Sequence, residues 1–495
     1  MARLPTSAPR GDAPAPPLDG APANDGLWSP HRRALSLGLV FTITLIAFEA
    51  LAVGTVMPAV AKELKGLELY GWAFAAFFLG DLVGIVVAGG LIDRTGLARP
   101  FVGGLTLFAL GLTVCGLAPS MQVLVAGRFL QGLGAGAIPP TAYVAIGRSL
   151  PDRLRPPMFA TLSTAWVLPG VIGPALAGGL TQLLGWRIVF VGLIPLVVVA
   201  GVMTLRSLMA VPDAATVTAT PPGEAAAGEA TRRRVPLALV LAAGAALVVG
   251  GLSAGDPALA AALIVGGLVL VVPTFRRLTP AGTLRAARGL PAAILLRGVA
   301  TAAFFAADAY VPLALQDWRG LPPAAAGIVL TAATLSWTAG SWVQAHRFDR
   351  WGARRLVGAG FVFLVVGVAT FGLILVREVP VLIVGIPTWA VAGLGMGLLY
   401  APLSLVTLRE APDGGQGAAT AALQLSDVLG TALGTGIGGG ILAAGVRLGS
   451  AQGASLAIVF GVAVVGGIVG LALSARLPGG ARAEASATAS ERSVA

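Results

Sequence analysis

The sequence has very little of the chemistry on which metalloenzymes and disulfide-stabilised proteins depend. Among 495 residues there is one cysteine, Cys115, and there are two histidines, His31 and His346. A single cysteine excludes an internal disulfide, and these scattered residues offer no cluster of metal ligands. Charged residues make up only 11% of the chain, whereas soluble domains carry roughly 25%. We therefore expect no metal, no cofactor and no soluble globular fold.

Apolar residues dominate the chain instead. They make up 56% of it, and the mean hydropathy is +0.87. A bilayer core about 30 Å thick requires roughly 20 apolar residues per helix. The sequence predicts an all-α integral membrane protein in which fourteen such runs form transmembrane helices, at residues 34–59, 70–92, 99–118, 121–148, 158–182, 186–208, 235–253, 257–275, 290–316, 322–345, 354–376, 379–408, 414–445 and 451–475.

The basic residues predict the orientation of these helices. Of 33 lysines and arginines, 25 fall on the side of the termini and six on the other side. Because cytoplasmic loops are enriched in Lys and Arg, we expect both termini in the cytoplasm. The net charge of +11 then reflects membrane topology, and no nucleic acid is expected as a partner.

Four polar stretches interrupt or flank the apolar runs. Residues 1–33 lack the apolar core of a signal peptide and are expected to be a disordered cytoplasmic tail. Residues 209–234 and 276–289 are expected to be cytoplasmic linkers, and 477–495 a second disordered tail, because small, polar and Pro- or Ser-rich segments cannot bury a core.

The two ends of the chain repeat one another. The pattern D-R-x-G follows the second expected helix at Asp93–Gly96 and recurs 256 residues later at Asp349–Gly352. The glycine run 132–136 recurs at 393–397, an offset of 261. Such a repeat is typical of transporters built from duplicated halves. We therefore expect two pseudo-symmetric six-helix bundles, 34–208 and 290–476, with 235–275 as an inserted helix pair.

Three motifs accompany the repeat: the loop motif, the fourth-helix motif Arg128-x-x-Gln131-Gly132, and a fifth-helix G-P motif. The loop motif comprises Asp93, Arg94, Gly96 and Arg99, with a second copy at Asp349, Arg350 and Gly352; the G-P motif includes Gly170, Gly173, Pro174 and Gly178. With these motifs the chain resembles the major facilitator superfamily, in particular its fourteen-helix drug:proton antiporter branch.

The resemblance implies a role for each motif. The loops would act as gates between the conformations, the fourth-helix motif is associated with proton coupling, and the G-P motif is typical of antiporters. The chain departs from the branch at several positions. Glu49 stands where an Asp is usual, Ala177 and Ala345 replace motif glycines, and Asp427 stands where a basic residue is common.

Charged residues inside the apolar runs are the strongest candidates for function. A charge at the bilayer centre costs about 2.5–3.5 kcal/mol even on the more lenient scale. At a rise of about 1.5 Å per residue, Glu49, Arg128 and Asp427 come to similar depths, and we expect them to share a central, water-accessible cavity. Further candidates are Asp81, Asp308 and Arg297; Arg297 is near enough to its helix end to snorkel.

The 261-residue offset adds two indoles to this expected cavity. It maps Arg128 onto Trp389 and Trp166 onto Asp427, so that each half has one charge and one indole at corresponding places. Together with Gln131, these residues are predicted to bind a lipophilic substrate, with the indoles as apolar walls. The alternative is that the indoles face lipid or neighbouring helices.

We interpret the chain as a proton-driven exporter of lipophilic small molecules in a bacterial cytoplasmic membrane. In this hypothesis Glu49 carries the proton, Arg128 tunes it, and Asp427 favours cationic substrates. Alternatives are a nutrient symporter or uniporter and a lipid-handling membrane protein of the same fold. An enzyme is not expected, since no set of nucleophile, base and orienting group is visible. The oligomeric state stays open, and a monomer is compatible with the sequence.

Overall fold

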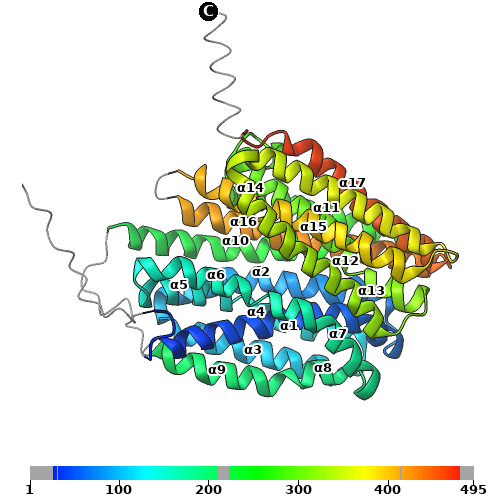
Figure 1. The fold of residues 1–495 in the computed structure, drawn as a ribbon, viewed down its shortest axis with the longest axis horizontal. Coiled ribbons are helices and arrows are strands. Elements are labelled where there is room, and N and C mark those ends of the chain that lie inside the picture. The colour runs from blue at the N-terminus through cyan, green and yellow to red at the C-terminus, as the bar shows by residue number, and fades with distance from the viewer. Residues whose placement is uncertain (1–25, 31, 210–221, 413–414, 480–495) are drawn as a thin grey trace, which may run out of the picture.

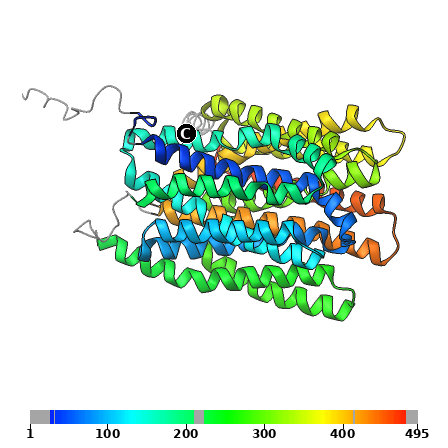
Figure 2. The same ribbon diagram turned by 90° about the horizontal axis from the view of Figure 1, so that it is seen from below.

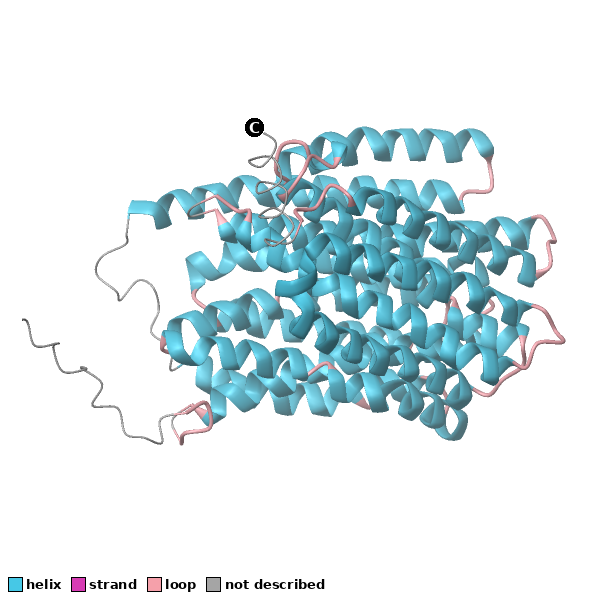
Figure 3. Cartoon of the chain, turned by 45° about the horizontal axis from the view of Figure 1, so that its top comes forward, coloured by secondary structure: helices cyan, strands magenta, loops and turns pink. Residues whose placement is uncertain are grey.

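The computed structural model describes residues 26–30, 32–209, 222–412 and 415–479 (Figure 1). Within these ranges the chain is helical and contains no β-strand (Figure 3). The expected tails, apart from a few residues next to the helices, and residues 210–221 of the expected linker lie outside the described part.

The first six passes form the N-terminal bundle, in the lower part of Figure 1. Three passes are divided, at Gly136, at Trp166 and at Gly192. The helices are α1 Arg33–Glu63, α2 Tyr70–Thr95, α3 Ala98–Gly116, α4 Met121–Ala135, α5 Ile138–Ser149, α6 Arg155–Thr164, α7 Val167–Leu184, α8 Arg187–Val191 and α9 Leu193–Met209, with short turns η1 Leu67–Leu69 and η2 Asp152–Leu154.

The last six passes form the C-terminal bundle, and two helices lie between the halves in the sequence. The inserted pair is α10 Pro222–Ser253 and α11 Pro257–Leu278. The bundle comprises α12 Leu290–Asp308, α13 Val311–Leu313, α14 Pro323–Phe371, α15 Val381–Arg409, α16 Gln416–Arg447 and α17 Gln452–Ser474, with short segments η4 Thr283–Arg285, η5 Ala314–Trp318 and η6 Gly372–Leu375.

The number of membrane passes agrees with the sequence prediction. Twelve helical segments are long and apolar enough to cross a membrane. One of them contains α14, in which Gly352 has a φ of 71° and reverses the chain, so that this segment makes two passes. Helices α4 and α5 are each short and together make one more. The described chain therefore crosses fourteen times, as predicted.

The repeated glycine run has the same packing role in both halves. In each bundle it lies on the fourth pass and allows the backbones of the second and third passes to approach closely. An added Cβ at each of these glycines would come within 2.7 Å of a backbone atom: Gly132 and Gly136 against α2, Gly134 against α3, and Gly393, Gly397 and Gly395 against the two arms of α14. The glycine run therefore allows close helix packing at corresponding positions of the two halves.

A second glycine ridge joins the fifth and first passes of the C-terminal bundle. The spacing of Gly430, Gly434 and Gly438 predicts a close-packing ridge, and the structure confirms it. A Cβ at Gly430 would be 2.2 Å from the carbonyl oxygen of Gly298, and one at Gly434 would be 2.3 Å from that of Ala302. Helix α16 is thereby held directly against α12.

The inserted pair packs on the outside of the bundles. Helix α10 contacts both α2 and α16, and α11 packs mainly on α10 (Figure 2). Leu241 and Ala245 of α10 are fully buried, in a cluster with Leu82 of α2 and Leu429 of α16. Because α10 begins at Pro222, part of the segment expected to be a linker is helical.

Hydrogen bonds join the two bundles in the half of the molecule that carries η1 and η5. The hydroxyl of Tyr70 donates to the carbonyl oxygen of Ala309 at 3.1 Å, and the amide of Gln316 donates to Thr55 O at 2.8 Å. A third hydrogen bond joins α14 to α7, where Thr331 Oγ1 donates to a carbonyl oxygen at 3.2 Å. The contacts of Tyr70 and Gln316 close the interface at the end of the molecule that carries η1 and η5.

Candidate functional site

Two ion pairs lie inside the membrane-spanning region, one in each bundle. In the N-terminal bundle Glu49 of α1 pairs directly with Arg128 of α4 through its Oε1 atom. Gln131, one turn after Arg128, donates from Nε2 to the same oxygen at 3.2 Å and accepts from Arg128 at 3.0 Å. The structure thus brings together three residues selected from the sequence.

The surroundings of Arg128 fix its position. Its Nε atom donates to the carbonyl oxygen of Ala73 at 3.0 Å, and the guanidinium lies 4.4 Å from the ring centroid of Phe77. Both partners belong to α2, which the glycine run of α4 allows to approach closely. The packing of α2 against α4 therefore orients the arginine towards Glu49.

This first pair is sealed from its surroundings. The side chains of Arg128 and Glu49 are 3% and 1% exposed. The expected open cavity around Glu49 and Arg128 is therefore absent from the conformation described. Glu49 Oε2 is buried and has no hydrogen-bond partner within the described chain. A carboxylate with one oxygen engaged and the other unpartnered can accept a proton without losing its existing hydrogen bonds.

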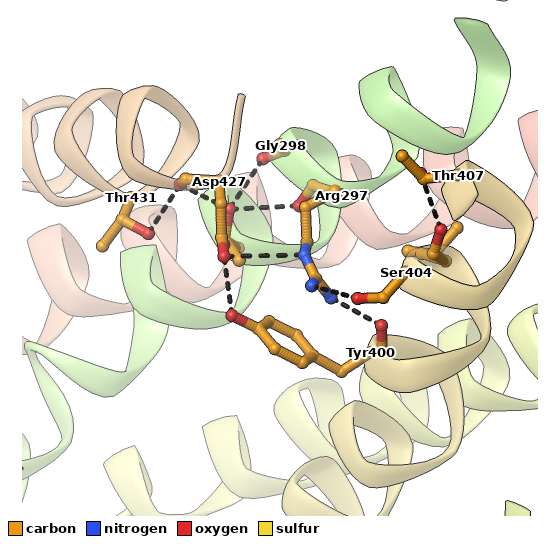
Figure 4. Close-up of polar contacts among 9 residues, drawn as sticks. Arg297, Gly298, Tyr400, Ser404, Thr407, Asp427 and Thr431 are labelled. Carbon is orange, nitrogen blue, oxygen red and sulfur yellow. Dashed lines mark hydrogen bonds and ion pairs between the residues drawn. The ribbon is translucent and has the colours of Figure 1, made fainter. Parts of the chain in front are cut away.

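The second pair, Arg297 with Asp427, lies in the C-terminal bundle (Figure 4). Arg297 of α12 approaches Asp427 of α16 with an Nε to Oδ2 distance of 3.5 Å. Asp427 Oδ2 accepts a hydrogen bond from the Tyr400 hydroxyl at 2.6 Å. The guanidinium donates to Tyr400 O at 2.6 Å and to Ser404 Oγ at 2.8 Å. Arg297 therefore does not snorkel to the helix end.

The surroundings of Asp427 differ from those expected. The sequence interpretation placed Asp427 in one cavity with Glu49 and Arg128 and gave it no charged partner of its own. In the structure Arg297 lies beside it. The indole of Trp389 is also not a cavity wall, because it is fully buried between Phe304 and Phe371, with ring centroids at 5.5 and 5.0 Å.

The remaining charged and aromatic candidates lie at different places. Trp166 is 46% exposed at the junction between α6 and α7, whereas Trp389 is fully buried. Asp81 of α2 is partly exposed and lies within electrostatic range of Asp427 across the bundle interface. Asp308, at the end of α12, lies beside the Trp389 indole, although the geometry falls short of a hydrogen bond.

The two copies of the loop motif have the same backbone turn. Gly96 and Gly352 both adopt positive φ, 74° and 71°, a region that residues other than glycine rarely occupy. Arg94 and Arg99 of the first copy and Asp349 and Arg350 of the second are exposed. The side chain of Asp93 lies outside the described part. Gly89, four residues before Asp93, faces open space, so close helix packing does not require a glycine there.

The G-P motif lies where the two bundles meet. A Cβ at Gly170 would be 2.1 Å from Thr334 Cγ2, and one at Gly178 would be 2.7 Å from Pro323, both on α14. Gly173 faces α1 instead, at ordinary contact distance from Phe48. The carbonyl of Pro174 approaches Gly327 of α14. The absence of side chains at Gly170 and Gly178 therefore allows α7 and α14 to pack closely against one another.

Sequence reasoning missed Tyr400 and Ser404, which hold Arg297. Neither carries a charge, and neither belongs to a recognised motif. The sequence did offer a signal for the ion pair itself. Arg297 and Asp427 carry opposite charges in the same bundle, and a buried charge requires a partner.

Comparison with known proteins identifies the family. The profile of the Major Facilitator Superfamily matches residues 39–435. This chain belongs to the major facilitator superfamily, a family of membrane transporters.

Two relatives illustrate the similarity. A probable multidrug-efflux transporter of Mycobacterium tuberculosis is 29% identical over 403 residues, which cover 78% of this chain and 82% of the relative. The drug efflux pump JefA of the same species is 26% identical over 472 residues, covering 91% and 83%.

Solved structures confirm the fold. The POT family transporter PepTSo matches with a TM-score of 0.64 at 16% identity, covering 89% of this chain and 97% of that one. A bacterial homologue of the human lysosomal transporter Spinster also matches with a TM-score of 0.64 at 16% identity, covering 90% and 96%.

Proposed function

We propose that this protein is a proton-coupled antiporter that exports lipophilic small molecules by alternating access. The observation that carries the proposal is the sealed Glu49–Arg128–Gln131 centre, because a buried carboxylate with one unpartnered oxygen suits reversible protonation. The names of the relatives, multidrug-efflux transporter and drug efflux pump, support small-molecule export. The proposal needs both the geometry of the centre, which supports proton coupling, and the names of the relatives, because the centre alone does not define a substrate.

The chemistry of the centre explains how a proton could drive a conformational change. Burial favours the neutral acid, whereas the adjacent guanidinium of Arg128 favours the carboxylate. A rearrangement that moved α4 relative to α1 would weaken the ion pair and favour proton uptake by Glu49. Loss of the proton would restore the pair and draw the two helices together. The proton and the bundle conformation would then be linked.

The distribution of basic residues gives this cycle a direction. With both termini in the cytoplasm, as 25 of 33 basic residues favour, the half that carries η1 and η5 faces outside. Two hydrogen bonds between the bundles, from Tyr70 and from Gln316, lie in that half. The structure then corresponds to a state closed to the outside, in a bacterial inner membrane, from which a substrate would be taken up on the cytoplasmic side.

Transport in reconstituted vesicles tests the proposal. The purified protein is reconstituted, a pH gradient is imposed with the membrane potential clamped, and uptake of lipophilic dyes is followed. Antiport predicts accumulation on the acidic side, with proton release when substrate is added. Movement of proton and substrate in the same direction would indicate a symporter, gradient-independent movement would indicate a uniporter, and transfer of labelled lipid alone would indicate a lipid exporter.

A further inference from the structure

The Arg297–Asp427 pair differs from the sealed pair in its accessibility. The side chain of Asp427 is 18% exposed, against 1% for Glu49. The closest approach of Arg297 Nε to the carboxylate is 3.5 Å, beyond a good hydrogen bond for two charged groups. Arg297 Nε is buried and has no hydrogen bond within the described chain. The carboxylate is therefore partly open to its surroundings, whereas Arg297 is buried, and the ion pair is only partly formed.

Arg297 is held in place by α15 and not by Asp427. Its two terminal nitrogens donate to Tyr400 O and to Ser404 Oγ, and its guanidinium lies 3.3 Å from the centroid of the Tyr400 ring. These contacts do not involve the carboxylate. Asp427 can therefore exchange its contact with Arg297 for a contact with another group while Arg297 stays where it is.

An apolar surface adjoins the partly exposed carboxylate. The rings of Tyr400 and Trp337 meet edge to face at 5.4 Å, and both residues are partly exposed. Trp337 in turn contacts Phe304. A lipophilic molecule with a polar group would find an aromatic wall and an acceptor oxygen next to one another here. The sealed pair offers no such access, so the two centres are suited to different tasks.

We propose that the Arg297–Asp427 pair is the element of the substrate site that selects for substrate charge. Asp427 accepts the cationic or hydrogen-bond-donating group of a lipophilic compound, and Arg297 offsets the charge of Asp427 so that neutral compounds are accepted as well. This proposal rests on the proposed export of lipophilic molecules and names the residues that set its selectivity. It does not depend on which residue carries the proton.

Three probes of similar shape and different charge test the proposal. Binding of tetraphenylphosphonium, triphenylphosphine oxide and tetraphenylborate to the purified full-length protein is measured by equilibrium dialysis. Arg297→Gln should improve binding of the cation relative to the neutral probe by about tenfold, and Asp427→Asn should weaken it by about tenfold while improving binding of the anion. The double variant should restore the wild-type order of the three probes.

Two further variants separate charge selection from structural damage. Arg297→Lys keeps the charge and should keep the wild-type order. Arg377→Gln makes the same change in charge at an exposed loop position and should leave all three affinities unchanged. Melting temperatures in detergent identify variants that fail to fold. If Arg297→Gln fails to fold, Asp427→Asn and the double variant carry the test.

The possible results are distinguishable. Equal losses for all three probes in both single variants, without recovery in the double variant, would overturn the proposed selectivity and leave the transport proposal intact. A wild-type protein that binds none of the probes would count against a lipophilic substrate altogether, and thus against both proposals. A shift that tracks the charge of the pair supports the assignment.

Discussion

Replacement of Glu49 by glutamine should uncouple transport from the pH gradient. Glutamine has nearly the same volume and keeps an oxygen that can accept from Arg128, but it cannot release a proton. Exchange of one proton per substrate stores about 1.36 kcal/mol for each pH unit. With the membrane potential clamped, a gradient of two pH units therefore supports about hundredfold accumulation. In Glu49→Gln the accumulation ratio should fall to about one, while binding is retained.

The same substitution also carries a cost in stability that must be measured. Breaking a buried ion pair by removing one partner costs about 3–5 kcal/mol, and the amide oxygen of glutamine should recover part of this. Glu63→Gln is the matched control, because Glu63 lies on the same helix and also pairs with an arginine, Arg187, but the two side chains are 50% and 43% exposed. An exposed pair is worth about 0–1 kcal/mol.

The assay is gradient-driven uptake into proteoliposomes, with melting temperature and binding measured in parallel. Glu49→Asp retains a carboxyl group and should keep gradient-driven accumulation, at a lower rate because the shorter side chain is farther from Arg128. Accumulation above equilibrium in Glu49→Gln would refute the assignment of Glu49 as the proton carrier. Loss of accumulation in Glu63→Gln would show that the assay responds to structural damage.

Three further tests address other parts of the structure. Asp93→Asn should lower the initial rate of export more than Asp349→Asn, because the first copy of the loop motif is the more complete; equal rates would argue against a gate at Asp93. Gly352→Ala should lower the melting temperature, because its positive φ costs a residue with a Cβ about 1–3 kcal/mol, whereas Gly89→Ala should leave it unchanged. Trp389→Ala should destabilise the protein by about 3–5 kcal/mol without changing the order of substrate preference, and a changed order would place the indole in the substrate site.

The residues of the sealed Glu49–Arg128–Gln131 centre could be predicted from the sequence, because charged residues are rare inside apolar runs. Glu49 and Arg128 are charges in apolar runs, and their depths can be counted from the ends of two uninterrupted stretches of helix. The duplicated glycine run was likewise visible as an offset, and its packing role follows from the absence of a Cβ. What periodicity cannot supply is the direction in which a side chain points within the bundle.

Trp389 illustrates this limit. The repeat correctly places it at the position that corresponds to Arg128, and both residues are almost fully buried, at 0% and 2% exposure. The error was the assumption that this position lines an open cavity. In the N-terminal bundle the position is occupied by a charge that finds its partner inside, and in the C-terminal bundle it is filled by an indole packed against Phe304 and Phe371.

The Arg297–Asp427 contact was missed for a different physical reason. Counting the rise along each helix gives depths for Cα atoms, and it placed Arg297 about 10 Å nearer the cytoplasmic end than Asp427. In the structure the two backbones lie at the same level, because Gly298, next to Arg297, packs against Ser426 and Gly430, which flank Asp427. Depths counted from the expected ends of two helices therefore placed neighbouring residues too far apart.

The two ion pairs differ in a way that duplication alone does not require. In the N-terminal bundle the acid is on the first pass and the arginine on the fourth, whereas in the C-terminal bundle the arginine is on the first pass and the acid on the fifth. A site that binds both a proton and a cationic substrate at one carboxylate must release one to accept the other. Carboxylates of different accessibility in separate bundles allow the two events to be linked through the relative movement of the bundles, without direct competition at one atom. Under the two proposals, Asp427 would select the charge of the exported molecule and Glu49 would hold the driving proton.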